Sequence, residues 1–212
     1  PAIYGASTKE IEKSSILNQK DFTRAKETIK YIKDKKWNSA LKSASKVKDR
    51  EFRNLIDWMY LKTTRNGASF SEYKNFIEQN SDYPRINRIR FLAEGKIYLR
   101  NNSPTSIINW FDKYPPLGGM GKIKLAEDYL EKGQTEKVQE LIKEGWETAT
   151  ISKNDLGYYR AKFKKFIDSE DHIRRADYLA WEKKYWDLKR MLKYLPKDQR
   201  VLYNARQILM SN

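Results

Sequence analysis

Apolar residues recur at helical spacing through almost the whole chain, and this period limits the possible folds more than any other feature. From Asp21 onward, apolar side chains return every three or four positions, as at Phe22, Ala25 and Ile29. This spacing places them on one face of an α-helix, whereas a half-buried strand needs strict alternation. None of the 212 residues belongs to an alternating segment. We therefore expect an all-α protein.

The breaks between these segments predict about twelve short helices. Ser103 before Pro104 is typical of an N-cap followed by proline in the first turn. Gly133 and Pro196 each end another segment. Short helices joined by short turns in one series favour a right-handed superhelical stack of hairpins, similar in kind to tetratricopeptide repeats, over residues 18–212.

Two stretches interrupt the helical pattern. Residues 1–17 carry Gly, Ser and Thr without periodicity, and we expect a flexible lead-in there. Residues 113–121 contain two prolines and three glycines, which predicts a hinge. This loop is not a phosphate-binding loop, because Ile123 follows Lys122 where a hydroxyl residue is needed, and Pro116 replaces the first glycine.

The last segment carries two apolar faces. Its main stripe is predicted to face the core and consists of Val201, Leu202, Ala205, Ile208 and Leu209. Tyr203 and Met210 form a second face, where further chain is expected to pack, because a terminal helix of a finished solenoid is polar outside.

The composition excludes several kinds of chemistry. Cysteine is absent, so thiolate metal sites and cysteine nucleophiles are excluded. His172 is the only histidine and is predicted to be a solvated residue at a helix start. The nearby carboxylates of Asp168, Glu170 and Asp171 are expected to interact with the positive end of the helix dipole. We expect no catalytic residue, no metal site and no cofactor in this chain.

The formal net charge of +15 would attract polyanions, including nucleic acid and cell-wall polymers. Lysines outnumber arginines and are spread along the chain, which favours a solvated basic surface over a nucleic-acid reader. No run of eighteen apolar residues is present, so no membrane span is expected.

Aromatic residues are numerous, with fourteen tyrosines and six tryptophans. Trp37, Trp58 and Trp110 lie on or beside apolar stripes and are predicted core residues. A candidate ligand or partner surface surrounds one helix junction and consists of Arg174, Arg175, Tyr178, Trp181, Lys183, Lys184, Tyr185 and Trp186. Aromatic rings beside basic groups can stack on sugars or bases. The alternative, packing between hairpins with lysines reaching outward, is favoured for these residues.

Residues from Trp58 to about Leu195 resemble the N-terminal superhelical region of bacterial soluble lytic murein transglycosylases. The resemblance lies in WMYLKTTRNGASFSEYKNFIEQNSDYPRINRIRFLAE, WFDKYPPLGGMGKIKLAEDYLEKGQ and DHIRRADYLAWEKKYWDLKRML. Family members often have Trp where this chain has Tyr83, and Arg where it has Lys122. The resemblance implies an enzyme that cleaves the bond between N-acetylmuramic acid and N-acetylglucosamine, using a glutamate in a separate C-terminal lysozyme-like domain. This chain contains neither that domain nor its Glu-Ser pair, so no catalytic residue is transferred.

From these features we expect a non-catalytic, periplasmic, monomeric scaffold that shapes peptidoglycan access or docks cell-wall proteins. It would be the helical part of a longer enzyme, or of a relative without the catalytic domain. The rival hypothesis is a cytosolic helical-repeat adaptor whose basic groove binds protein or nucleic acid. A free-standing enzyme is the least favoured of the three.

Overall fold

The computed structural model describes residues 13–210, and these residues are all-helical, with twelve α-helices and no β-strand. The prediction of an all-α stack of about twelve helices is confirmed. The chain forms two compact units, which are described separately: unit 1 holds residues up to 68 with Asn75–Ser81, and unit 2 holds Ser69–Lys74 with residues from 82 onward. None of the described helices is long and apolar enough to cross a membrane.

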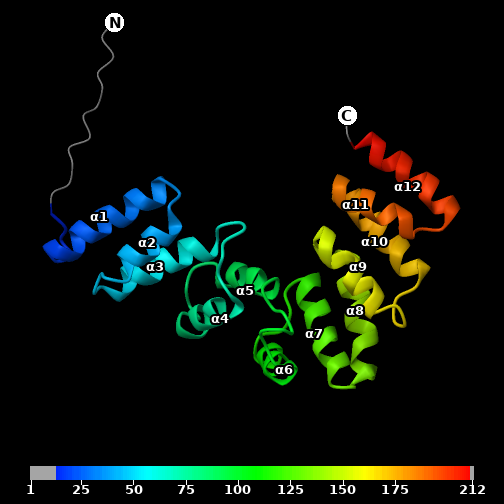
Figure 1. Cartoon of the computed structure of the whole chain (residues 1–212), viewed down its shortest axis with the longest axis horizontal. Helices are drawn as coiled ribbons and strands as arrows, with labels where there is room; N and C mark the ends of the chain where they lie inside the picture. The colour runs from blue at the N-terminus through cyan, green and yellow to red at the C-terminus, as the bar shows by residue number, and fades with distance from the viewer. Residues whose placement is uncertain (1–12, 211–212) are drawn as a thin grey trace, which may run out of the picture. The chain divides into compact units, whose positions relative to one another are not determined.

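Unit 1 is built on three helices that pack in chain order: α1 (Gln19–Lys33), α2 (Trp37–Ala44) and α3 (Arg50–Leu61) (Figure 1). Asn18 caps α1 by accepting the N–H of Asp21, and Asp49 caps α3 by accepting the N–H of Phe52. Such caps satisfy backbone donors that the first turn leaves unpaired. The next helix, α4 (Phe70–Gln79), has residues in both units.

Unit 2 is a series of helices, and several of them pack on their neighbours in the chain. The helices are α5 (Ile86–Glu94), α6 (Pro104–Lys113), α7 (Gly119–Glu131), α8 (Val138–Thr148), α9 (Lys153–Lys162), α10 (Ser169–Trp181), α11 (Tyr185–Met191) and α12 (Lys197–Leu209). Among neighbours, α6 packs on α7, α7 on α8, and α10 on α11. Contacts also join some helices that lie two apart in the chain: α5 with α7, α8 with α10, and α10 with α12. Figure 1 shows α7 and α8 lying side by side. This pattern is typical of stacked helical hairpins.

The inward face of α12 differs from the prediction. Tyr203 and Gln207 are buried, and the Tyr203 hydroxyl donates to Asp177 of α10. The stripe expected to face the core is solvent-exposed instead, with Val201 at 73% and Leu209 at 72%. The prediction was wrong because α12 has two apolar faces, and the face with Tyr203, whose hydroxyl bonds to Asp177 of α10, is the one that packs inward.

Other predictions are partly corrected. Trp110 is a core residue, whereas Trp37 and Trp58 are only half-buried at the surface of unit 1. Most of the predicted lead-in, residues 1–12, lies outside the described residues, and residues 13–17 contain no helix. The predicted hinge at 113–121 does not separate the two units, because the whole loop belongs to unit 2.

Candidate functional site

A cleft of about 650 Å³ opens between several elements of unit 2, and we call it the unit 2 cleft. Its walls come from α5 and the turn after it, the start of α7, the α8–α9 connection, α9 and α10. The side chains that line it include Phe91, Tyr98, Lys122, Thr148, Thr150, Ser152, Asp155 and Tyr178. Three aromatic rings and several hydroxyl groups therefore line one concave surface, as is typical of ligand sites.

A buried carboxylate holds one wall of the cleft in place. Glu94, at the end of α5, is 3% exposed and accepts the backbone N–H groups of Leu117 at 2.5 Å and Gly118 at 3.0 Å. Gly121 donates to the same carboxylate. Burial raises the pKa of Glu94, although these N–H donors oppose the rise. The loop predicted to be a hinge is thus fastened to α5, because a buried carboxylate needs these donors.

Glycine is required where this wall meets its neighbours. A Cβ atom at Gly121 would overlap the Glu94 carboxyl group, and one at Gly119 would lie 2.5 Å from the Ala149 nitrogen. Gly145 of α8 faces α7 in the same way, since its Cβ would lie 2.8 Å from the Gly119 oxygen. The glycines of the loop therefore allow close helix packing.

The charges within the cleft are nearly balanced, in contrast to the chain as a whole. Lys122 forms an ion pair with Glu144, so its charge is neutralised locally. Asp155 adds a carboxylate, whose Oδ2 accepts a hydrogen bond from Ser152 at 2.7 Å. Ser152 in turn caps α9 through the N–H of Asp155. The cleft therefore lacks the strong positive field expected of a polyanion site.

A smaller cavity of about 280 Å³ shares Tyr98 and Asp155 with the cleft. Arg100, Glu127 and Tyr158 also line it. The Tyr158 hydroxyl donates to Glu127 at 2.6 Å. The two cavities thus meet at one tyrosine and one aspartate.

Buried charged residues of α7 lie beside this smaller cavity. Lys124 is 2% exposed, and its Nζ lies 4.2 Å from the centre of the Tyr98 ring. Burial lowers the pKa of Lys124, and burial raises the pKa of Asp128 to about 7. Oδ1 of Asp128 has no hydrogen-bond partner among the described residues, which fits a neutral carboxyl group. Lys162 of α9 pairs with Glu127 at 3.1 Å.

Sequence reasoning missed both the cleft and this charged cluster. The charged residues of α7 have the spacing of a solvated helix face, so only tertiary packing reveals their burial. The loop with its prolines and glycines was a usable signal for the cleft. Glycines in a loop often mark a place where the backbone comes close to a neighbouring element, and this loop lines the cleft.

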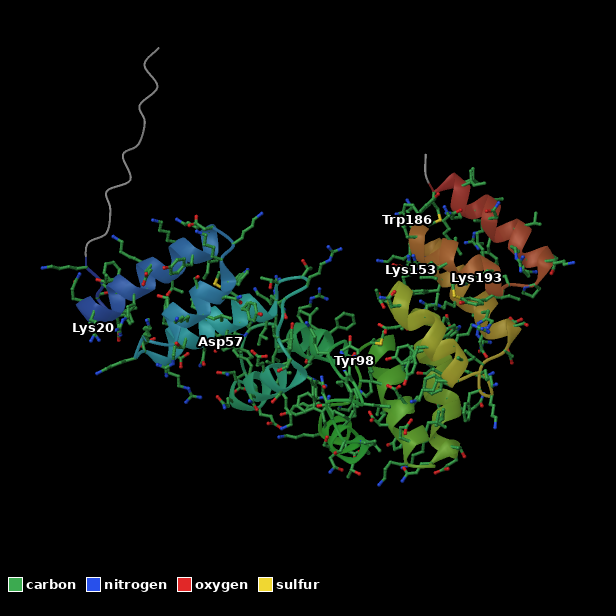
Figure 2. The ribbon with its side chains drawn as sticks, in the orientation of Figure 1. Lys20, Asp57, Tyr98, Lys153, Trp186 and Lys193 are labelled. Atoms are coloured by element: carbon green, nitrogen blue, oxygen red, sulfur yellow. The ribbon has the colours of Figure 1, made fainter. Side chains whose placement is uncertain are left out.

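The surface predicted around the α10–α11 junction is only partly assembled. Trp181 and Trp186 are 79% and 65% exposed, so they do not pack between hairpins. Tyr178 lines the unit 2 cleft instead. Figure 2 labels Tyr98, on the cleft, and Trp186, at the start of α11, in separate parts of unit 2.

The other residues of that prediction have mixed positions. Lys183 and Lys184 are exposed in the turn, Arg174 pairs with Asp171, and the Tyr185 ring packs edge-on against Trp186. Arg175 does not belong to any surface, because it is 1% exposed. Its Nη1 donates to the backbone oxygens of Trp146 at 2.6 Å and Ala149 at 2.8 Å, at the end of α8.

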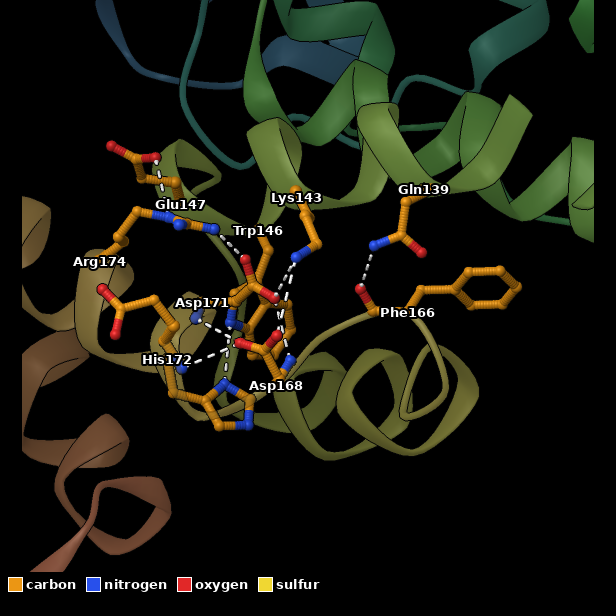
Figure 3. A network of polar contacts seen from close by, with 10 residues as sticks. Gln139, Lys143, Trp146, Glu147, Phe166, Asp168, Asp171, His172 and Arg174 are labelled. Atoms are coloured by element: carbon orange, nitrogen blue, oxygen red, sulfur yellow. Dashed lines mark hydrogen bonds and ion pairs between the residues drawn. The ribbon is translucent and has the colours of Figure 1, made fainter. Parts of the chain in front are cut away.

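His172 was predicted to be solvated and is instead buried. Its Nδ1 accepts a hydrogen bond from Nε1 of Trp146 at 3.1 Å, and burial lowers its pKa (Figure 3). The expected carboxylate capping is confirmed, since Asp168 and Asp171 form a reciprocal capping box at the start of α10. Lys143 of α8 contacts both carboxylates, at 3.7 Å and 3.4 Å. This network joins α8 to α10 and has a structural role.

Comparison of the chain with protein-family models, with curated proteins and with solved structures gave no match.

Proposed function

We propose that this chain is a non-catalytic helical scaffold of the lytic murein transglycosylase type, which acts in the periplasm and presents peptidoglycan to a separate catalytic domain or docks cell-wall proteins. One observation carries the proposal. Residues from two separate parts of the family-like sequence are bonded to each other in unit 2, where Glu94 accepts the N–H groups of Leu117 and Gly118.

This contact joins two of the segments that carry the resemblance. Glu94 ends the first motif, and the loop at 115–121 lies in the second, more than twenty residues later. The bonded loop forms a wall of the unit 2 cleft. The residues of this contact thus shape a concave surface, which is what a scaffold for a polymeric substrate needs.

Sedimentation with purified peptidoglycan sacculi tests the proposal. We expect the purified chain to sediment with sacculi at about 0.3 M salt, where purely electrostatic attraction is strongly screened. We also expect no release of anhydro-muropeptides into the supernatant. Either a failure to sediment or a measurable release of these products would contradict the proposal.

The surplus of basic residues favours a second candidate, a helical-repeat adaptor that binds nucleic acid or acidic protein. A salt titration of binding to single-stranded DNA and RNA separates the two candidates. Tight binding near physiological salt with a steep salt dependence would favour the adaptor. Weak binding that disappears by that salt concentration would favour the scaffold.

A further inference from the structure

We propose that the C-terminal end of unit 2 docks on an anionic lipid surface, with the exposed face of α12 in contact with the lipid. The contact surface, which we call the C-terminal patch, consists of large apolar side chains that are exposed: Trp181, Trp186, Val201, Leu202, Ile208 and Leu209. Such docking goes beyond the proposed function, because both the partner and the residues differ. It requires only shallow contact with one leaflet of a membrane.

The aliphatic part of the patch is a stripe along one side of α12. Val201 and Leu209 are 73% and 72% exposed, and Leu202 is exposed as well. Their spacing places them on the side of the helix opposite the buried Tyr203 and Gln207. Single exposed apolar residues are ordinary on protein surfaces, whereas a contiguous group of large ones marks an interaction site.

Two exposed tryptophans lie at the end of unit 2 where this stripe ends. Trp181 is the last residue of α10, and Trp186 lies in the first turn of α11, after the turn at 182–184. Because a short connection joins α11 to α12 and the two helices pack together, the start of α11 lies near the end of α12. Figure 2 labels Trp186 at this end of unit 2. Tryptophan combines a large apolar ring with an N–H donor, which suits the boundary between lipid and water.

Basic side chains accompany the patch. Residues 183–210 contain eight lysines and arginines but only two aspartates, and one of these, Asp187, is paired with Arg190. Lys183 and Lys184 are exposed in the turn between the two tryptophans, and the exposed Lys197 lies one helical turn before Val201. Lysines at the edge of an apolar surface attract anionic headgroups while the apolar side chains enter the interface.

An anionic lipid surface fits these features better than the other possible occupants. A second copy of the chain would bring the same cations against each other. Nucleic acid would pair with the cations but would gain little from aliphatic side chains. A partner helix needs a groove that receives its side chains, whereas the stripe projects from a single helix. Only a lipid surface uses the cations, the tryptophans and the aliphatic stripe together.

Co-sedimentation of the full chain with phospholipid vesicles tests the inference. At about 0.1 M salt, we expect vesicles of phosphatidylcholine with phosphatidylglycerol to bind at least about tenfold more tightly than vesicles of phosphatidylcholine alone. Tryptophan fluorescence should shift to shorter wavelength on binding, because the exposed rings of Trp181 and Trp186 leave water. Equal affinity for the two kinds of vesicle, or no binding to either, would overturn the inference.

The double variant Val201→Gln, Leu209→Gln tests the apolar contact without changing the charge. Both side chains are exposed, so the fold should be kept while the affinity for anionic vesicles falls at least about tenfold. Ile16→Gln is the matched control and should bind like the wild type, because Ile16 is 85% exposed but belongs to unit 1. Unchanged affinity in the double variant would reveal attraction through charge alone and would overturn the inference.

A second pair of variants tests whether the position of the cations matters. Lys183→Gln with Lys184→Gln should weaken binding to anionic vesicles at least about fivefold. The control is Lys35→Gln with Lys36→Gln, which removes the same charge from the turn between α1 and α2 and should change the affinity less than about twofold. The two turns are matched, since φ is 58° at Lys35 and 54° at Lys183. Equal losses in both variants would show that only the net charge matters, which contradicts docking through the patch.

Two further measurements identify other occupants. If sedimentation velocity without vesicles shows a dimer that Val201→Gln, Leu209→Gln dissociates, the patch serves self-association and the inference fails. If the chain leaves vesicles unbound but loses sacculus binding in that variant, the patch contacts the cell wall, so the inference fails while the scaffold proposal stands. Vesicle binding through the patch without sedimentation on sacculi has the opposite meaning. Thermal unfolding of each variant shows that a lost affinity does not come from a lost fold.

Discussion

Arg175 provides a sharp test of how unit 2 is held together, because it is a buried cation bonded to backbone oxygens. It is 1% exposed, and its Nη1 donates to the carbonyls of Trp146 and Ala149 at 2.6 and 2.8 Å. Burial lowers its pKa to about 10, so it stays charged at neutral pH. We expect Arg175→Met to leave both carbonyls at the end of α8 without this donor.

The size of the loss follows from these contacts. A hydrogen bond from a charged group contributes about 1.5–3 kcal/mol net of desolvation. Since one nitrogen serves both carbonyls, we take the lower end for each and expect a loss of about 3 kcal/mol in the free energy of unfolding. That corresponds to a fall in melting temperature of roughly 6–12 °C for a chain of this size.

Urea unfolding followed by far-UV circular dichroism measures the loss, and hydrogen exchange of the α8 amides locates it. The neighbouring Arg174→Met is the matched control, because Arg174 is 41% exposed and its partner Asp171 keeps Lys143. Such a pair contributes about 0–1 kcal/mol. Equal unfolding midpoints for the two variants would refute the argument. So would a gain in stability at Arg175, which can follow when a buried charge is replaced by an apolar side chain.

Further substitutions test three other parts of the fold. Gly121→Ala should lower the free energy of unfolding by about 2–3 kcal/mol, because the new Cβ overlaps a buried carboxyl group. Gly157→Ala is the control: its Cβ meets open space, so alanine in this helix should raise the free energy of unfolding by about 0.5–1 kcal/mol. Equal melting temperatures for the two variants would contradict this. Burial raises the pKa of Asp128 from 3.8, its ordinary value, to about 7 in the folded protein. Between these two values the unfolded chain is ionised while the folded protein holds the proton, so the wild type loses stability as pH rises from about 4 to about 7. The stability of Asp128→Asn relative to the wild type should therefore rise by about 2.5 kcal/mol between pH 5 and pH 8. A pH-independent difference between the two proteins would rule out the neutral carboxyl group. Tyr203→Ala should lower the free energy of unfolding by about 3 kcal/mol, because Tyr203 is buried, and Leu202→Ala by less than about 0.5 kcal/mol, because Leu202 is exposed. Denaturant titration measures both losses. A larger loss for Leu202→Ala would show that the stripe containing Leu202 is the buried one.

The parts of the fold that depend on neighbouring residues were predictable from the sequence. Ser103 and Pro104 begin α6 as expected, and Asp168 with Asp171 caps α10. These features work through contacts between residues within four positions of each other, so the sequence pattern contains the whole signal.

The parts that depend on distant partners were not predictable. Arg175 bonds to carbonyls 26 and 29 residues away, and Glu94 bonds to amides 23 and 24 residues away. Charged side chains in helices resemble a solvated face, and only packing reveals that these two are buried. The same limit applies to the cleft, where Tyr178 was recognised as a candidate but Phe91 and Asp155 were not.

The outer face of α12 should set how the protein behaves at high concentration. Its exposed apolar ridge favours contact between copies, while the net charge of +15 keeps them apart. Dissolved salt shortens the range of that repulsion from about 10 Å at 0.1 M to about 3 Å at 1 M, but does not weaken the apolar attraction. Concentrated solutions should therefore be clearest in dilute buffer and become turbid as salt is added.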